Sequence, residues 1–181
     1  IISIDYIGND YLALEIETAG RNELRILPVD KIASPMGIKV IDLLGEKGLE
    51  AYRRTREQLV SALQRHQGVT LIAEDADGEN IGLKRKNGHW YLMGRINFQR
   101  GSTFTYQDFQ LNIIPPATLI FYDRLTLSWQ NIKDRVPGAM DVFTSPNKDI
   151  ALIKTRNKLY VYPVTDQRLE SKPLAELELK E

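Results

Sequence analysis

Hydrophobic and polar residues alternate along much of the chain, and this period of two predicts β-strands. The opening alternates over residues 1–7, 11–17 and 23–29, with turn-forming residues between the runs. Later alternating or apolar runs predict further strands at residues 69–73, 81–86, 89–98, 103–114, 118–122, 150–154, 159–164 and 174–179. We therefore expect a protein built mainly of short strands.

One long segment follows a helical period instead. From Glu46 onward, apolar residues recur three or four positions apart, at Leu49, Tyr52 and Leu59 among others. Gly68 follows the last of them, as is common after a helix C-terminus. The pattern predicts one long amphipathic helix over residues 46–67.

A second, shorter helix is expected near the C-terminal third. Ser128 is a suitable N-cap for a helix over Trp129–Val136, and Pro137-Gly138 would end it. In the strand at 103–114, the apolar positions change phase between Tyr106 and Phe109, which predicts a β-bulge there.

Two dipeptides predict tight hairpin turns, Asp77-Gly78 and Asn87-Gly88, because Asp, Asn and Gly tolerate the positive φ angles of such turns. Together they predict an antiparallel meander whose strands follow one another directly. Its strands are residues 69–73, 81–86 and 89–98.

The two turns fix which side chains share a face of the meander. Ile72 should lie opposite Leu83, and Leu83 opposite Leu92. We expect this row, with Ile81 and Trp90 beside it, to be the core face, covered by the long helix. We expect the guanidinium of Arg85 over the Trp90 ring as a cation–π contact. The other face would carry Lys84, Lys86, His89 and Tyr91.

These elements predict an α+β protein with mainly antiparallel sheets. One long helix, about residues 46–67, would pack on a β-meander at 69–98, and the C-terminal half would be β-rich. We expect an α+β subdomain over residues 1–100 and a β-rich subdomain over 101–181, packed together as one globular unit.

Composition removes several classes of protein from consideration. The 181 residues include 24 basic and 24 acidic ones, so the net charge is zero and a nucleic-acid partner is not expected. Cysteine is absent, which excludes disulfides, thiolate metal sites and a cysteine nucleophile within this sequence. No apolar run reaches membrane-spanning length, so we expect no transmembrane segment in this chain.

The same features favour an extracytoplasmic location over a cytoplasmic one. A cysteine-free β protein with many glycine turns suits a secreted or lipid-anchored, bacterial lipoprotein-like protein, and the sequence begins at Ile1 rather than at methionine, as it would if an anchor had been trimmed.

The sequence contains few residues that could act together in a catalytic or metal-binding site. His66 and His89 have no acid or further ligand nearby in the sequence. Asp75, Asp77 and Glu79 surround a glycine, but that glycine and the residue at the twelfth position do not match a calcium-binding loop. No nucleophile elbow occurs. We therefore expect no catalytic residue, no metal ligand and no cofactor, and we favour a protein that is not an enzyme.

The feature that most favours a binding function is a segment whose charged residues are all basic. From residue 81 to 107 there are five basic residues and no acidic one, with aromatic residues between them. Basic and aromatic side chains on one sheet face can hold phosphates or other anions. Strand alternation alone also predicts a solvated polar face here, and we prefer that interpretation. The candidate binding residues are Lys84, Lys86, His89, Tyr91, Arg95 and Arg100.

The segment Asn87-Gly88-His89-Trp90-Tyr91, which follows the long helix, resembles the Gly-x-Trp-Tyr hairpin of exported bacterial domains with the nuclear-transport-factor-like cone. The resemblance implies a helix packed on a curved antiparallel sheet. It covers few residues, and residues 1–40 depart from the pattern of that family.

Three functional hypotheses remain. The leading one is a non-catalytic, extracytoplasmic binding or interaction domain for an unknown protein or small ligand. The alternative is an anion- or nucleic-acid-binding protein that uses the basic face from Lys84 to Arg100. The third is a small-molecule enzyme with a cone-type pocket near Tyr52 and His89. The sequence leaves the oligomeric state open.

Overall fold

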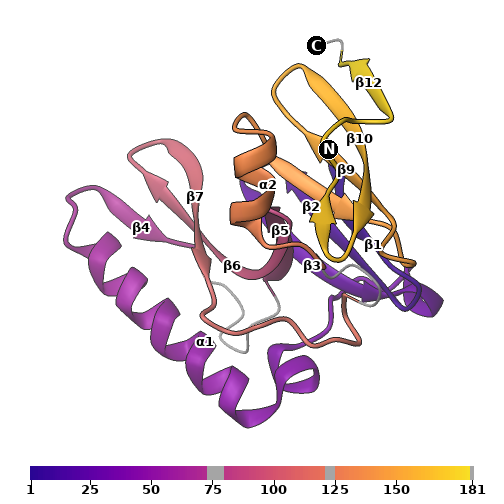
Figure 1. The fold of residues 1–181 in the computed structure, drawn as a ribbon. Helices are drawn as coiled ribbons and strands as arrows, with labels where there is room; N and C mark the ends of the chain where they lie inside the picture. Colours follow the sequence, from indigo (N-terminus) through magenta and orange to yellow (C-terminus); the bar gives the residue numbers. More distant parts are fainter. Residues whose placement is uncertain (73–79, 121–124, 180–181) are drawn as a thin grey trace. The chain divides into compact units, whose positions relative to one another are not determined.

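The structure, a computed structural model, describes residues 1–72, 80–120 and 125–179. The chain forms two compact units (Figure 1), one made of residues 1–84 and 91–119 and the other of residues 85–90 and 120–181. Strands hold 44% of the residues and helices 21%, and the sheets are mostly antiparallel. The expected α+β class is therefore confirmed. The expected division into subdomains at residue 100, packed together as one globular unit, stays a prediction.

The first unit begins with a three-stranded antiparallel sheet in the order β1-β2-β3. Its strands are β1 (Ile2–Ile7), β2 (Tyr11–Thr18) and β3 (Arg21–Pro28), close to the expected ranges. The register of β1 on β2 shifts between Ile4 and Tyr6. A short 3-10 turn, η1 (Val29–Lys31), follows Pro28, which cannot donate a sheet hydrogen bond.

The long helix is confirmed in part: it starts before the expected residue 46 and ends before the expected residue 67. Helix α1 spans Val40–Gln64, and Gly45 inside it has non-helical angles (φ 68°). A first helical turn therefore precedes the kink, and the regular amphipathic part begins at Glu46, where the period changes. Its buried side includes Leu49, Tyr52 and Leu63.

The second sheet of this unit corrects the expected meander. It contains β4 (Val69–Leu71), β5 (Ile81–Lys86), β6 (His89–Arg100) and β7 (Thr103–Gln110), and β6 bonds to the other three. The first of these strands, β4, pairs with the far end of β6, where Leu71 lies opposite Phe98, rather than with β5.

Two backbone hydrogen bonds show how β4 and β5 are arranged. Ile72 N donates to Asn97 O, and Arg95 N donates to Asn80 O. Backbone groups two residues apart on a strand point to the same sheet edge, so β4 and β5 follow each other along one edge of β6. The expected pairing of Ile72 with Leu83 is therefore wrong. The expected Asp77-Gly78 turn lies outside the described residues.

The second turn is confirmed, and so is the burial of the expected core residues of β5 and β6, but not that of Ile72. Asn87 and Gly88 both have positive φ, 53° and 73°, as a two-residue hairpin turn requires. Ile81, Leu83 and Leu92 are fully buried, and Trp90 is nearly so, whereas Ile72 is only half-buried. Burial of each large side chain contributes about 1.5–3 kcal/mol.

The first unit has three layers: the β1–β3 sheet, the β4–β7 sheet and α1. Helix α1 lies along β4 and β7 (Figure 1), and Tyr52 packs on Phe109 with ring centroids 5.4 Å apart. On the opposite face, Leu24 of β3 packs so closely over Gly82 that a Cβ there would lie 3.0 Å from the Leu24 Cβ. Both faces of the β4–β7 sheet are thus covered in part.

The expected bulge in β7 is wrong. The register of β6 on β7 runs without a shift from Met93 opposite Gln110 to Arg100 opposite Thr103. The apolar positions change phase for another reason: Tyr106 lies on the same face as Arg95, and Phe109 lies on the face toward α1. Because both faces are covered in part, apolar residues occur on both.

The second unit is an antiparallel sheet with a short helix. The helix is α2 (Trp129–Arg135), and Ser128 Oγ caps it by accepting from Asn131 N at 3.2 Å, as expected. The sheet order is β11-β10-β9-β8, with β12 also paired to β10. The strands are β8 (Asp141–Thr144), β9 (Ile150–Lys154), β10 (Lys158–Thr165), β11 (Arg168–Leu169) and β12 (Ala175–Glu178).

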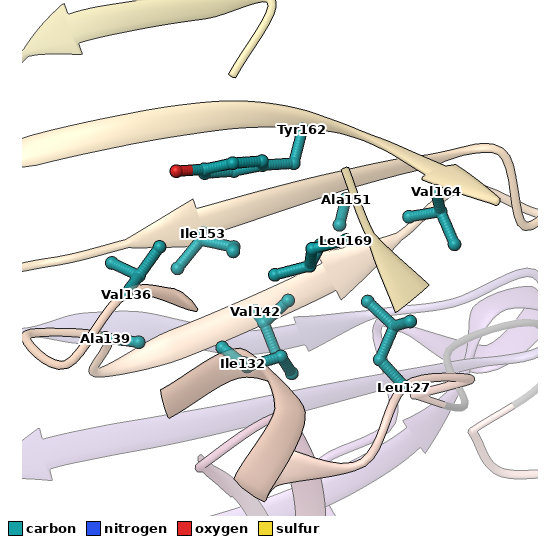
Figure 2. Packing of buried hydrophobic residues seen from close by; sticks show 10 residues of the cluster. All are labelled: Leu127, Ile132, Val136, Ala139, Val142, Ala151, Ile153, Tyr162, Val164 and Leu169. Atoms are coloured by element: carbon teal, nitrogen blue, oxygen red, sulfur yellow. The ribbon is translucent and has the colours of Figure 1, made fainter. Parts of the chain in front are cut away.

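One apolar cluster holds this unit together (Figure 2). Side chains of β8, β9 and β10 form one wall, Ile132 of α2 lies across from them, and Leu169 of β11 points into the cluster. Tyr162 also lies in it, and burial raises the pKa of the Tyr162 phenol. Strands β8 and β11 were not expected from the sequence.

Two further expectations concern the strand at residues 118–122 and the absence of a transmembrane segment. Residues 118–120 form a turn and not the start of a strand, since they follow Pro115-Pro116, and residues 121–122 of that expected strand lie outside the described part. Among the described residues, no helix is long and apolar enough to cross a membrane.

Candidate functional site

The six candidate binding residues do not form one surface. Lys84 and Tyr91 are half-buried and Arg95 is buried, all in the first unit. Lys86 and His89 are exposed on either side of the turn in the second unit, and Arg100 is exposed at the far end of β6. Only Lys84 and Arg95 come together, because both bind Glu15.

Arg95 is the centre of a charged cluster between the two sheets of the first unit. Its side chain is only 1% exposed. Nε and Nη2 donate to the two carboxylate oxygens of Asp108, at 2.6 and 2.9 Å, and Nη1 donates to Glu15 Oε1 at 2.6 Å. The guanidinium also lies 3.7 Å from the centroid of the Tyr106 ring. This fork geometry is the strong form of an arginine–carboxylate pair.

Lys84 completes the cluster on the other side of Glu15. Its Nζ donates to both oxygens of Asp5 at 3.0 Å and to Glu15 Oε2 at 2.9 Å. Two cations thus face three carboxylates, and both oxygens of Glu15 are occupied. Five strands contribute one residue each: β1, β2, β5, β6 and β7.

The pKa directions agree with this geometry. Burial acts to raise the pKa of Glu15, but hydrogen bonds from Lys84 and Arg95 outweigh it, and the pKa lies below its ordinary value. For Lys84, burial acts to lower the pKa, whereas the bonds to Glu15 and Asp5 raise it overall. The pKa of Arg95 is raised by Asp108 and Glu15 against the effect of burial. Each group is therefore held in its charged form.

Sequence reasoning missed the acidic partners of Lys84 and Arg95. It treated their face as solvated, but β1 and β2 cover it with Asp5 and Glu15. A usable signal was present, since Asp5 and Glu15 are acidic residues within the short, largely apolar strands β1 and β2. Asp108 is the first acid after the basic run, and the register places it directly opposite Arg95.

Two asparagines join β3 to the second sheet. Asn97 Oδ1 accepts from Asn22 N at 3.0 Å, and Asn97 Nδ2 donates to Asn22 O at 2.9 Å, so the amide imitates a neighbouring strand. Asn80 Oδ1 accepts from Leu24 N at 2.7 Å. Farther along β3, Ile38 N donates to Ile26 O. The edge of β3 is thus closed by side chains and a loop.

Arg85 has a comparable structural role in the second unit. The expected contact with Trp90 is confirmed, with 5.2 Å from the guanidinium carbon to the ring centroid. The same guanidinium lies over Phe143 at 3.9 Å and binds Asp141 and Val142 O. Asp141 Oδ1 also accepts from Gly88 N at 2.8 Å.

The remaining candidate chemistry stays dispersed. His66 and His89 are both exposed. Tyr52, proposed for a cone-type pocket, is buried against Phe109. Within the ranges that the structure describes, no three His, Cys, Asp or Glu residues could hold a metal ion together. The acidic segment with Asp75, Asp77 and Glu79 lies outside those ranges.

Comparisons of the chain with protein-family models, curated proteins and solved structures found no match.

Proposed function

We propose that this protein is a non-catalytic, extracytoplasmic binding or interaction domain, and that it takes up an extended segment of a partner protein along strand β1. The observation that carries the proposal is an edge strand with aliphatic side chains in solvent. Ile2, Ile4 and Ile7 of β1 are all exposed, and β1 is an outer strand of its sheet.

The aliphatic surface extends from β1 onto β2. The register sets Ile2 beside Ile16 and Ile4 beside Leu14, and these two residues of β2 are half-buried. Cross-strand aliphatic neighbours on one face make a continuous apolar patch, and such patches on folded proteins mark interaction surfaces.

The two edges of this sheet differ, which supports β1 as the docking edge. The edge of β3 is closed by Asn97, Asn80 and Ile38. In contrast, the described residues place no backbone hydrogen bond on β1 other than those with β2. An open edge can add an extended peptide through main-chain hydrogen bonds, while alternate side chains give specificity. An apolar extended segment suits the patch.

The charged cluster favours a binding role over catalysis. Arg95, Lys84 and Glu15 have their charges matched by each other and by Asp5 and Asp108. Groups held in this way stabilise the fold and are not poised for proton transfer at neutral pH. The same pairing supports the interaction hypothesis over anion binding at Lys84 and Arg95.

The location is proposed from composition. A chain of 181 residues without cysteine is compatible with an oxidising compartment, because it has no thiol to oxidise. Fractionation of cells that express the full-length protein would test this part, and its recovery with cytoplasmic markers would contradict it.

The docking test places a photo-crosslinking residue at position 4, or at the exposed loop residue Ile114 as control, in the full-length protein in its native cells. Ile4 and Ile114 are 59% and 85% exposed. We expect a cross-linked protein at position 4 that is absent at position 114. A synthetic peptide covering the cross-linked segment should bind the purified protein, and Ile4→Asp should weaken it by about tenfold or more.

Ile114→Asp provides the matched control for that binding measurement, since it adds the same charge away from β1. Thermal melts would establish that both variants fold. Equal capture at both positions, or unchanged peptide binding by a folded Ile4→Asp variant, would contradict the proposal.

A further inference from the structure

We infer that the first unit has a second binding site, a small cavity at the edge of β3 that takes a molecule carrying an oxyanion group, a carboxylate or a phosphate. The cavity has a volume of about 230 Å³, and its wall includes Arg21, Glu23, Leu24, Arg25 and Asn80. None of these residues belongs to the aliphatic surface of β1.

The described residues of the cavity wall carry an excess of positive charge. Arg21 Nε lies 2.9 Å from Glu23 Oε1, and Arg25 binds the other oxygen, Glu23 Oε2, through Nε and Nη2. One carboxylate therefore serves two guanidiniums, which leaves one positive charge among the described residues of the cavity wall. In the described structure both guanidiniums bond only to Glu23, so they retain N–H groups for another acceptor.

The cavity wall also contains a buried hydrogen-bond donor without a partner among the described residues. Asn80 is 4% exposed, and its Nδ2 has no hydrogen-bond partner among the described residues. The orientation of the amide is fixed, because Oδ1 accepts from Leu24 N at 2.7 Å and a flipped amide would set two donors against each other. A buried unpaired donor is unfavourable, and an acceptor in the cavity would relieve it.

These observations specify the chemistry of the ligand. The uncommitted groups around the cavity are donors, so the ligand must supply acceptors, and the excess charge requires that it be negative. Arginine N–H pairs match the spacing of carboxylate and phosphate oxygens. The side chain of Arg21 is 42% exposed and that of Arg25 24%, so the site opens to solvent at its arginine side while Asn80 forms its buried wall.

Titrations followed by NMR would test the inference on the purified chain. The probes are succinate, inorganic phosphate and succinamide, the last being a neutral analogue of the first. We expect succinate or phosphate to shift the side-chain amide signals of Asn80 and the backbone amide of Leu24, and succinamide to leave them unchanged. A larger effect of succinate identifies an organic acid, and a larger effect of phosphate identifies a phosphate group.

Arg25→Gln tests the charge, and Arg54→Gln on the exposed side of α1 is the matched control. We expect Arg25→Gln to weaken anion binding by about tenfold or more and Arg54→Gln to change it less than twofold. Arg21→Gln, at the exposed side of the cavity, provides a second variant should Arg25→Gln unfold.

Three results would overturn the inference: no shift at Asn80 with either anion, equal shifts with succinamide, or equal weakening by the Arg25 and Arg54 variants. Because β1 is not involved, loss of peptide binding at Ile4 and loss of anion binding at Arg25 are separate outcomes.

Discussion

At the scale of single residues, the first unit shows how partners offset the desolvation cost of a buried arginine. Arg95 would be costly to desolvate alone, but Asp108 and Glu15 bind three of its nitrogens, and Tyr106 covers a face of the guanidinium. Such a pair contributes little net stability compared with apolar residues of the same shape. Removal of one partner, however, leaves an uncompensated charge. The cluster therefore enforces the pairing of particular strands.

Glu15 makes the stability of the protein depend on pH in the acidic range. Its pKa is lower in the folded than in the unfolded state, so it stabilises the fold above the ordinary value of 4.5, and this contribution is lost as pH falls through the lowered pKa. We expect Glu15→Gln to reduce the loss of unfolding free energy between about pH 5 and about pH 2. Urea denaturation across that range measures it.

Glu50→Gln, on the exposed surface of α1, is the control for that series. Its stability should fall with acidification as steeply as that of the unmodified protein. A Glu15→Gln variant with an equally steep fall would show that the Glu15 carboxylate gains nothing from Lys84 and Arg95 in the folded state.

At the scale of elements, two asparagine amides determine how the β1–β3 sheet meets β6. Asn97 makes a reciprocal pair of hydrogen bonds with the backbone of Asn22, and Asn80 holds Leu24 N. A strand edge is usually paired by another strand, but here side chains do so. The sheet is fixed without becoming continuous with its neighbour.

Substitution of Asn97 should therefore loosen the edge of β3. We expect Asn97→Ala to lower the unfolding free energy by about 1–3 kcal/mol, because it leaves the amide and carbonyl of Asn22 without partners. Hydrogen exchange of the Asn22 amide should accelerate. Asn112→Ala, at an exposed bend, is the control and should change neither quantity. Unchanged exchange at Asn22 would contradict the role given to Asn97.

Elements set by local sequence were predictable, whereas pairings between distant segments were not. Positive φ at Asn87 and Gly88 follows from the residue types, and the period of Leu49, Tyr52 and Leu63 follows from helix geometry. The pairing of Leu71 with Phe98 depends on which of two strands β4 meets, and the residues of β4 do not encode that choice. Reasoning from turn residues alone therefore paired β4 with β5, whereas β4 pairs with β6.

The acidic partners of the candidate site could not be predicted from the sequence for a related reason. Alternation predicts which side chains share a face, and Lys84, Tyr91 and Arg95 do so. It does not predict what covers that face. Asp5 and Glu15 lie about seventy to ninety residues away along the chain, and their position follows only from tertiary packing. The cavity beside Asn80 brings Asn80 together with residues 21–25, more than fifty positions earlier in the chain, for the same reason.

At the scale of the whole molecule, part of the balance between basic and acidic residues is visible as ion pairs. Among the 24 basic and 24 acidic residues, Lys84 and Arg95 of the basic run are each paired with carboxylates of neighbouring strands. The apolar surface left exposed on β1 and β2 is then a better candidate for recognition than the basic run. In the second unit Arg85 and Asp141 show the same pairing.

The most direct test of this account is a double-mutant cycle between Glu15 of β2 and Arg95 of β6. The unfolding free energy would be measured by urea denaturation at neutral pH for the unmodified protein, Glu15→Gln, Arg95→Met and the double variant. We predict a coupling energy of about 1–3 kcal/mol, since each single variant leaves the other charge without its partner. Additive effects, with a coupling energy near zero, would contradict the claim that Glu15 of the first sheet compensates the buried charge of Arg95.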